Sequence, residues 1–437
     1  MLEEYFNKNL LQAGPFEVSP VLALGVSGGP DSIALLHCAK NWAKQNKAVL
    51  VVLTVDHGLR PAAKDEVQKV ANWSKELGIT SHILTVPAWH ESRNVLAKAR
   101  EWRYKLMITW CRENNILHLL TAHQQDDQVE TFFNRLERGS GLEGLCSMQL
   151  ITEIDHVRLI RPFLGTDRQQ IKKFLVDRKI NWIDDPSNQD NQYFRARWRK
   201  IFPTLAEQQL LSAKRVELAI YHLNQANQVI EQQISDLVTQ SILISPLGYI
   251  KINLKIFLQA SPELGLRVLS RCLMMVGGND YSARYHNLLA LYDKIAKPLF
   301  AGTTIAGCLL NRQEQSLLIM REVASIQSEI SISTSPQLWD RRFLILLNNE
   351  QSLSAKYKVR KLGIGRKKLV ESIHKNFSNN QGYPLGHVPA KVLQTLPALW
   401  DEEGLAAIPN LVLYRDKKDL ENLQCQFYPQ QPITKLR

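Results

Sequence analysis

The sequence predicts an α/β protein: a doubly wound, Rossmann-like parallel sheet, then a helical domain and a small α+β domain at the carboxyl end. Residues 20–205 alternate short apolar runs with helix-like segments, as repeated β-α units do. After about Leu205 this alternation stops and long Gln-, Leu- and Ala-rich segments follow. A chain of 437 residues also exceeds one ordinary core, so several domains are expected.

In the first half, continuous apolar runs are typical of parallel strands that are buried on both faces. The clearest run is Ala48–Val55. Pro61 opens a predicted helix that stops at Gly78, and Thr166 with Gln169 predicts a capping box for a later helix. The expected strands are 21–26, 48–55, 79–86, 117–121 and 159–163, and the expected helices are 33–42, 61–78, 95–113, 128–138 and 166–179.

The second half of the chain has a different residue pattern. Ala206–Ser241 predicts one long helix, and Phe257–Lys297 predicts helices that are interrupted at Gly277-Gly278. The Ser- and Ile-rich stretch Ser325–Ser335 is interpreted as a linker, and short strands with Gly and Pro turns follow it. The predicted domains are therefore 1–210, 211–325 and 335–437.

Composition narrows the class of protein. The formal net charge is +12 and the pI is about 9.3, which favours a polyanionic partner such as nucleic acid, although a merely basic protein is the alternative. The six cysteines are scattered, with no CxxC pair and no zinc spacing, as suits a reducing cytoplasm. We find no secretory signal, and no apolar run approaches the ~20 residues that span a membrane, so a cytoplasmic protein is expected.

A glycine-rich loop between the first strand and its helix carries the strongest chemical signal. Paired glycines let the backbone approach a ligand, and the amides at the helix start donate to phosphate oxygens. The loop lacks the GK[ST] ending of a Walker A motif and is not GxGxxG, and an ordinary tight turn is the alternative. The predicted pyrophosphate cradle consists of Ser27, Gly28, Gly29, Pro30, Asp31 and Ser32.

Acidic residues follow two other predicted strands. Asp56 ends the second strand, where it could reach a nucleotide ribose or simply cap the strand end. Asp127 and Glu130 are three residues apart at a helix start, so they share one face. Two carboxylates placed together favour a cation between them, either Mg²⁺ or an ammonium group. The alternative is simple charge complementarity with the helix dipole.

These motifs together resemble a known family. The loop resembles the PP-loop of ATP-pyrophosphatases, and His123–Leu145 is similar to the HHxDDQxET…RGSG signature of tRNA(Ile)-lysidine synthetases. The segments Ala99–Tyr104, Asp185–Asp190 and Tyr193–Arg199 are similar to further motifs of that family, in the expected order. The resemblance covers most of residues 20–205 and is weaker beyond. Two positions depart from the family pattern: Gln124 replaces a His and Ala196 replaces an Asn.

The resemblance implies that ATP, with Mg²⁺ held by Asp31, activates the wobble cytidine of tRNA(Ile) with a CAU anticodon, and that free L-lysine then attacks it. Residues 1–210 would be the catalytic domain, 211–325 a helical tRNA- or substrate-binding domain and 335–437 a tRNA-binding domain. The expected catalytic residues are Asp31, Arg103, Asp127, Glu130 and Arg195. The loop and Asp56 would bind ATP. The residues expected to bind tRNA or lysine are Arg100, Tyr104, His123, Arg138 and Arg199.

Two alternatives remain at this stage, and a homodimer is one option for the assembly. A tRNA thiolase with the same loop would need cysteines at the active face, where Cys111 and Cys146 are single residues in apolar settings. A non-catalytic tRNA-binding protein with a vestigial nucleotide fold would not need Asp31, Asp127 and Glu130. Pyrophosphate release that depends on both tRNA and lysine distinguishes the three.

Overall fold

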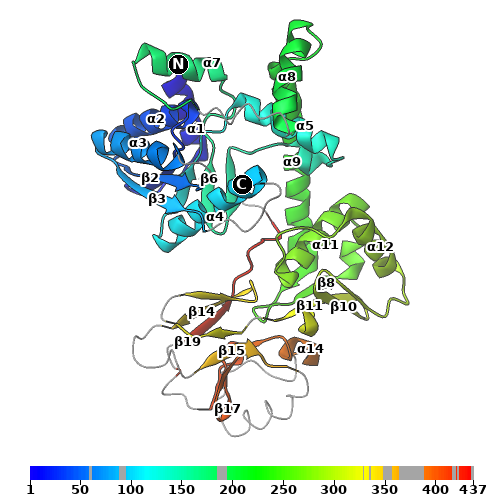
Figure 1. Ribbon diagram of the computed structural model, residues 1–437. Coiled ribbons are helices and arrows are strands. Elements are labelled where there is room, and N and C mark those ends of the chain that lie inside the picture. Colours follow the sequence, from blue (N-terminus) through cyan, green and yellow to red (C-terminus); the bar gives the residue numbers. More distant parts are fainter. Residues whose placement is uncertain are drawn as a thin grey trace. The chain divides into compact units, whose positions relative to one another are not determined.

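A computed structural model describes most of the chain (Figure 1). The described ranges are 1–58, 62–87, 95–184, 194–327, 329–333, 336–347, 357–363, 388–415, 420 and 423–434, without the side chains at 62, 96, 97, 194–197, 199, 200 and 203. The chain forms two compact units, Met1–Asn227 and Gln228–Arg437, which are taken one at a time below. Within the described residues, no helix combines the length and apolarity needed to cross a membrane.

The first unit is built on a six-stranded sheet in the order β3-β2-β1-β4-β6-β5. All neighbouring strands pair in parallel except β5 with β6, which pair as an antiparallel hairpin at one edge. The doubly wound sheet that the sequence predicts is confirmed. The strands are β1 (Val21–Gly25), β2 (Val49–Asp56), β3 (Thr80–Thr85), β4 (His118–Leu120), β5 (Ile151–Ile154) and β6 (Val157–Ile160).

Helices cover both faces of this sheet, because strand side chains alternate between two cores. Leu22 and Leu24 of β1 lie in the core formed with α1, α2 and α7, whereas Ala23 lies in the core formed with α4. Two further helices, α5 and α8, pack against each other through the stacked rings of Phe133 and Trp198, 4.1 Å apart. The helices are α1 (Leu2–Ala13), α2 (Pro30–Asn46), α3 (Ala62–Glu76), α4 (Val95–Glu113), α5 (Gln125–Glu137), α6 (Leu142–Leu145), α7 (Arg168–Asp177) and α8 (Phe194–Glu207).

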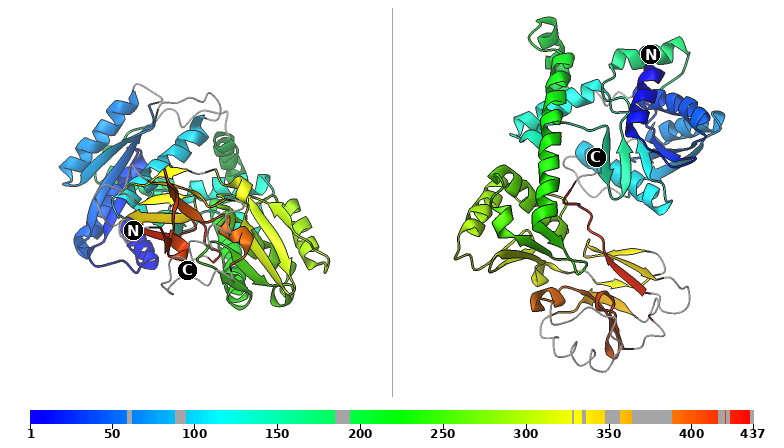
Figure 2. Two further views of the ribbon diagram at one scale, coloured as in Figure 1. Left: turned by 90° about the horizontal axis from the view of Figure 1, so that it is seen from below. Right: turned by 180° about the vertical axis from the view of Figure 1, so that it is seen from behind.

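Several boundaries differ from the sequence expectation. The N-terminal helix α1 and the edge strand β5 were not anticipated. The predicted cap of α7 is wrong: Asp167, and not Thr166, is the capping residue, and its side chain accepts from the Gln169 amide at 2.7 Å. The long helix expected over 206–241 is broken: α8 ends at Glu207, and α9 (Ala213–Ser241) begins after a turn (Figure 2). Pro61 lies outside the described residues.

The second unit contains three antiparallel sheets, ordered β7-β8-β11-β10-β9, β12-β15-β16-β17-β18 and β13-β14-β19. The first sheet packs with α11 and α12 around one hydrophobic core, and a second core lies among the later strands. Its helices are α10 (Leu254–Phe257), α11 (Pro262–Gly277), α12 (Tyr285–Ala296) and α14 (Ala390–Leu393). Its strands are β7 (Ile242–Ile244), β8 (Ile250–Asn253), β9 (Thr303–Ile305), β10 (Cys308–Gln313), β11 (Ser316–Arg321), β12 (Ile330–Ser331), β13 (Gln337–Trp339), β14 (Phe343–Leu347), β15 (Lys358–Lys361), β16 (Pro397–Asp401), β17 (Gly404–Ile408), β18 (Leu413–Tyr414) and β19 (Leu423–Phe427).

The sequence therefore misses the sheet β7–β11, whose strands lie within the expected helical domain 211–325 but outside the helices predicted at 206–241 and 257–297. The linker expected at Ser325–Ser335 is also wrong in part, because Ile330–Ser331 pairs with β15 and Ile332 is buried. An alternation of Ser and Ile is a strand pattern as well as a linker composition. The finer division into three domains stays a prediction.

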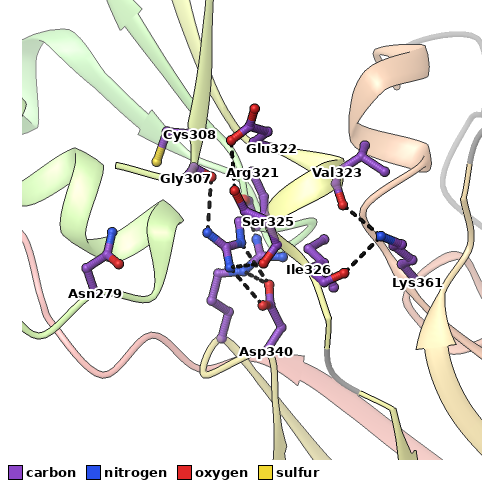
Figure 3. A network of polar contacts seen from close by, with 12 residues as sticks. Asn279, Gly307, Cys308, Arg321, Glu322, Val323, Ser325, Ile326, Asp340 and Lys361 are labelled. Carbon is purple, nitrogen blue, oxygen red and sulfur yellow. Dashed lines mark hydrogen bonds and ion pairs between the residues drawn. The ribbon is translucent and has the colours of Figure 1, made fainter. Parts of the chain in front are cut away.

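A buried ionic network ties β11 to the β13–β14 turn in the second unit (Figure 3). Asp340 accepts from Arg321 through both carboxylate oxygens, each at 3.0 Å, and from Arg342 at 2.8 Å. Arg342 is fully buried, and burial lowers its pKa while the charge of Asp340 raises it. One carboxylate thus compensates two buried guanidinium groups.

We predict that Asp340→Asn destabilises the second unit by about 3–5 kcal/mol, because it leaves two buried cations without a counter-charge. Asn tolerates the positive φ of 47° at this position, so the backbone conformation is preserved. The matched control is Asp280→Asn, which removes a half-exposed partner of Arg341 and is expected to cost less than about 1 kcal/mol. Urea denaturation followed by tryptophan fluorescence measures both, and equal midpoint shifts would contradict the prediction.

Candidate active site

The glycine-rich loop joins β1 to α2 and has the geometry of an anion cradle. Gly28 has φ +86°, and its carbonyl accepts from the Ile183 amide at 2.9 Å. Ser32, in the first turn of α2, donates its hydroxyl to Gly29 O at 2.9 Å and accepts from the Ser27 amide at 3.2 Å. The loop is thus closed on itself, and the first-turn amides of α2 have no acceptor within their own helix. Such amides bind phosphate oxygens.

The end of β2 adjoins this loop, since β1 and β2 are paired neighbours. Asp56 is buried and accepts from the Gly58 amide at 2.8 Å, so one of its oxygens holds the turn after the strand. Burial lowers the pKa of His57, and the nearby charge of Arg103 lowers it further. The structure therefore brings the predicted Arg103 of α4 close to the strand end that carries Asp56.

Three predicted residues meet at the end of β4. Arg100 Nη2 lies 3.0 Å and Tyr104 Oη 2.9 Å from His123 Nε2. A guanidinium can only donate, so Nε2 accepts and the ring proton is on Nδ1, which donates to Thr121 Oγ1 at 3.0 Å. His123 is thus neutral and fixed on both sides, with the Tyr104 ring nearly parallel to it. The cluster presents a fixed cation and a phenol.

The start of α5 carries the predicted carboxylates. The Gln124 side chain caps the helix by accepting from the Asp126 amide at 2.6 Å. Asp127 completes a capping box, because its Oδ2 accepts from the Gln124 amide at 3.1 Å. One oxygen of Asp127 therefore has a local role in capping the helix. Glu130 is 2 % exposed, one turn further along the same face.

Sequence reasoning missed two arginines beside this site, the buried Arg161 and the half-buried Arg135. Arg161 directly follows β6; it donates to Gln149 O at 2.8 Å, and burial lowers its pKa to about 10. Arg135 of α5 donates to the carbonyls of Gly144 and Ser147 at 2.7 and 3.0 Å. A charged residue directly after an apolar parallel strand is the signal that could have identified Arg161.

Within the part of the chain that the structure describes, other predicted residues do not join this cluster. Arg138 is exposed at the far end of α5, about 16 Å along the helix from Asp127. Arg195 and Arg199 lie on α8, but their side chains are outside the described residues, as is the side chain of Ala196. The segment 185–190 is likewise outside the description.

The first-turn amides of α2 suit a nucleotide phosphate. Gly28 leaves no room for a side chain, because an added Cβ would lie 2.7 Å from Ile183 Cδ1. Among the described residues, no group of three His, Cys, Asp or Glu side chains could enclose a metal ion. Mg²⁺ commonly needs only one or two carboxylates beside substrate phosphates and waters. Asp31 at the start of α2 suits that sparse type of site.

The cysteines do not suit thiol chemistry. Cys111 and Cys146 are 0 % and 2 % exposed, and burial raises the pKa of Cys111 to about 12. A thiolate, which is the reactive form, is therefore disfavoured at Cys111. This burial argues against the thiolase alternative.

Comparisons with known proteins agree with the site. A family model described as PP-loop domain matches residues 2–205. The tRNA(Ile)-lysidine synthase of Wolbachia pipientis wMel is 36% identical over 357 residues, covering 80% of this chain and 82% of that protein. The chain belongs to the tRNA(Ile)-lysidine synthase family. The lysidine synthase of Orientia tsutsugamushi (strain Boryong) is 33% identical and spans 98% of this chain and 97% of its own.

Among solved structures, the U34-tRNA thiolase NcsA from Methanococcus maripaludis with its [4Fe-4S] cluster is similar at 18% identity. That match has a TM-score of 0.44 and covers 51% of this chain and 78% of the thiolase. Membership in the lysidine synthase family makes the protein an ATP-binding ligase of tRNA modification. The Gln124 departure has a structural explanation, because its amide still caps the helix that carries Asp127.

We predict that Gly28→Ala weakens ATP binding and destabilises the first unit by at least about 1–2 kcal/mol, because a Cβ is strained at positive φ. The collision with Ile183 adds to this cost. Gly29→Ala is the stability control: its φ is −69° and the nearest atom to an added Cβ is Ser27 Oγ at 3.8 Å, so a cost under about 1 kcal/mol is expected. Calorimetric ATP titration and urea denaturation test this, and equal stability of the two variants would refute it.

Proposed function

We propose that the enzyme joins free L-lysine to carbon two of the wobble cytidine in the CAU anticodon of tRNA(Ile), through an adenylated tRNA. The product, lysidine, changes decoding from AUG to AUA. One observation carries the proposal: β1 and β4 are adjacent and parallel, so the phosphate cradle and the carboxylate-bearing start of α5 leave the same sheet edge. Nucleotide and amine can therefore meet at one crevice.

In the first step, the O2 atom of the cytidine attacks the α-phosphorus of ATP, and the bond to the departing pyrophosphate breaks. The loop Ser27–Ser32 would hold the pyrophosphate, and Arg103 or Arg195 would offset the charge at the α-phosphate. Mg²⁺ held by Asp31 would neutralise phosphate charge when bound.

In the second step, the lysine Nε attacks carbon two, the bond from carbon two to O2 breaks, and AMP leaves with that oxygen. The ammonium group must lose a proton before it attacks, and Asp127 or Glu130 would orient the amine or accept the proton. Arg100, Tyr104 and His123 would contact tRNA or lysine beside them. Arg138 and Arg199 would contact tRNA phosphates further away. The cytoplasm is the proposed location, and a homodimer stays a prediction.

The direct test combines purified protein, ATP and radiolabelled lysine with a tRNA(Ile) transcript bearing CAU. Lysine incorporation into tRNA and stoichiometric release of AMP and pyrophosphate are expected, with no incorporation into tRNA(Met), which shares the anticodon. Pyrophosphate release without tRNA, or incorporation of a group other than lysine, would refute the proposal.

We predict that Asp31→Ala abolishes tRNA adenylation and leaves tRNA affinity nearly intact, because Asp31 lies in the phosphate cradle at the start of α2. Pyrophosphate release and a filter-binding titration measure the two properties separately. An equal loss of tRNA affinity would indicate a role in folding instead.

We also predict that replacing both Cys111 and Cys146 by Ser leaves lysine transfer largely unchanged, apart from some loss of stability. Both thiols are buried and, in the case of Cys111, held protonated, so neither is available for sulfur transfer. A folded double variant that has lost all activity would revive the thiolase alternative.

A further inference from the structure

Helix α5 has two chemically different sides. Asp127 and Glu130 lie about 60° apart around the helix axis. On the other side lie Gln125, Val129 and Phe132, roughly 130–170° around the axis from the midpoint between the two carboxylates. Val129 packs there with Val216 and Ile220, both from α9 (Figure 1). Helix α9 therefore packs against the side of α5 that is opposite the two carboxylates.

A single polar contact ties α9 to the first residue of α5. Gln125 Nε2 donates to Glu217 Oε2 at 2.8 Å, two residues before Asp127. The backbone amide of Gln125 also donates to Thr166 O at 3.1 Å, so the backbone and the side chain of this residue are both held. Behind it, a Cβ at Gly165 would lie 2.3 Å from Tyr5 Oη and 3.6 Å from Glu217 Oε1. The Glu217 carboxylate is thus half-buried and lies beside Gly165.

The first turn of α5 is also held at Gln128, independently of this contact. Gln128 exchanges hydrogen bonds with Met148, donating to its carbonyl at 2.7 Å and accepting from its amide at 2.8 Å. Asn224 of α9 donates to Cys146 O at 3.2 Å and accepts from Gln149 at 2.7 Å. Loss of the Glu217 contact would therefore loosen Gln125, the first residue of α5, while Gln128 keeps the helix attached.

We propose that Glu217 is a positioning residue for the lysine-binding end of α5, acting through Gln125. The inference rests on the proposed function for the identity of the amine. Burial raises the pKa of Glu217, while the Gln125 hydrogen bond and the charge of Lys214 lower it. A half-buried carboxylate that only filled space would be replaced at no loss by an apolar side chain, whereas an acceptor for Gln125 would not.

Steady-state lysidine formation tests the proposal with two variants. Glu217→Ala removes the acceptor, and the KM for lysine is expected to rise about tenfold, as for loss of one hydrogen bond to a charged group. The affinity for tRNA and the KM for ATP should be unchanged, because Gln125, the partner of Glu217, is not part of the phosphate cradle. Glu217→Gln keeps an oxygen acceptor of the same shape and should restore the wild-type KM.

Two controls separate positioning from other effects. Asp236→Ala removes a carboxylate from the same helix, where it accepts only from the neighbouring Gln232 at 2.9 Å in the described contacts, and it should leave the KM for lysine unchanged. Gln125→Ala should reproduce the effect of Glu217→Ala, and the double variant should be no worse than either single one. Additive losses, or an equal defect in Glu217→Gln, would overturn the proposal, the latter because it would indicate a direct charge effect.

A substrate-free readout separates this proposal from the proposed function. Hydrogen exchange at the amides of residues 126–130 should accelerate in Glu217→Ala and remain slow in Glu217→Gln. If wild type formed no lysidine but the exchange changed as expected, only the proposed function would fail. If lysidine formed while both the exchange and the KM for lysine were unaffected by Glu217→Ala, the positioning role would fail.

Discussion

The pairing of β1 with β4 is the constraint on which the active site depends. Leu22 pairs with His118 and Leu24 with Leu120, in parallel, although about a hundred residues separate the two strands. The sheet grows outward from this pair in both directions, through β2 and β3 on one side and β6 and β5 on the other. The chain therefore leaves β1 and β4 toward opposite sides of the sheet, the topology at which doubly wound folds bind ligands.

Three cations near the carboxyl ends of these strands are held in fixed positions. Arg100 is bonded to His123, Arg161 to backbone and Thr152, and Arg135 to two carbonyls. Although burial lowers the pKa of Arg161 to about 10, the group stays protonated at neutral pH. Fixed cations in a partly dry environment act on phosphate groups more strongly than solvated ones. Such surroundings suit substrates as anionic as ATP and tRNA.

The sequence was informative where one physical pattern dominates. Apolar runs bounded by Gly and Pro residues predicted the buried strands of the first sheet and helix α4. Helix α4 begins and ends at the expected residues. Local residue chemistry likewise pointed to the loop Ser27–Ser32, whose role in binding phosphate stays a prediction. The family resemblance pointed to Arg100, Tyr104 and His123, which lie together in the structure and whose role also stays a prediction.

Where two patterns compete, sequence reasoning was less successful. Ile242–Ile244 continues directly from a long helix, so β7 cannot be distinguished from a further helical turn by periodicity alone. Asp167 and Thr166 are both good capping residues, and only the backbone geometry selects Asp167. The contact between Gln125 and Glu217 joins residues 92 positions apart, which no local pattern encodes.

The positions of the thiols make it possible to follow how this protein unfolds. Cys38, Cys111 and Cys272 each lie in a different hydrophobic core, and all three are 0–1 % exposed. None of the six cysteines is paired in a disulfide. The time at which a reagent first alkylates each thiol therefore reports when the core around that thiol opens. Peptide mapping after a brief pulse of reagent would give the order in which the cores open, without any introduced label.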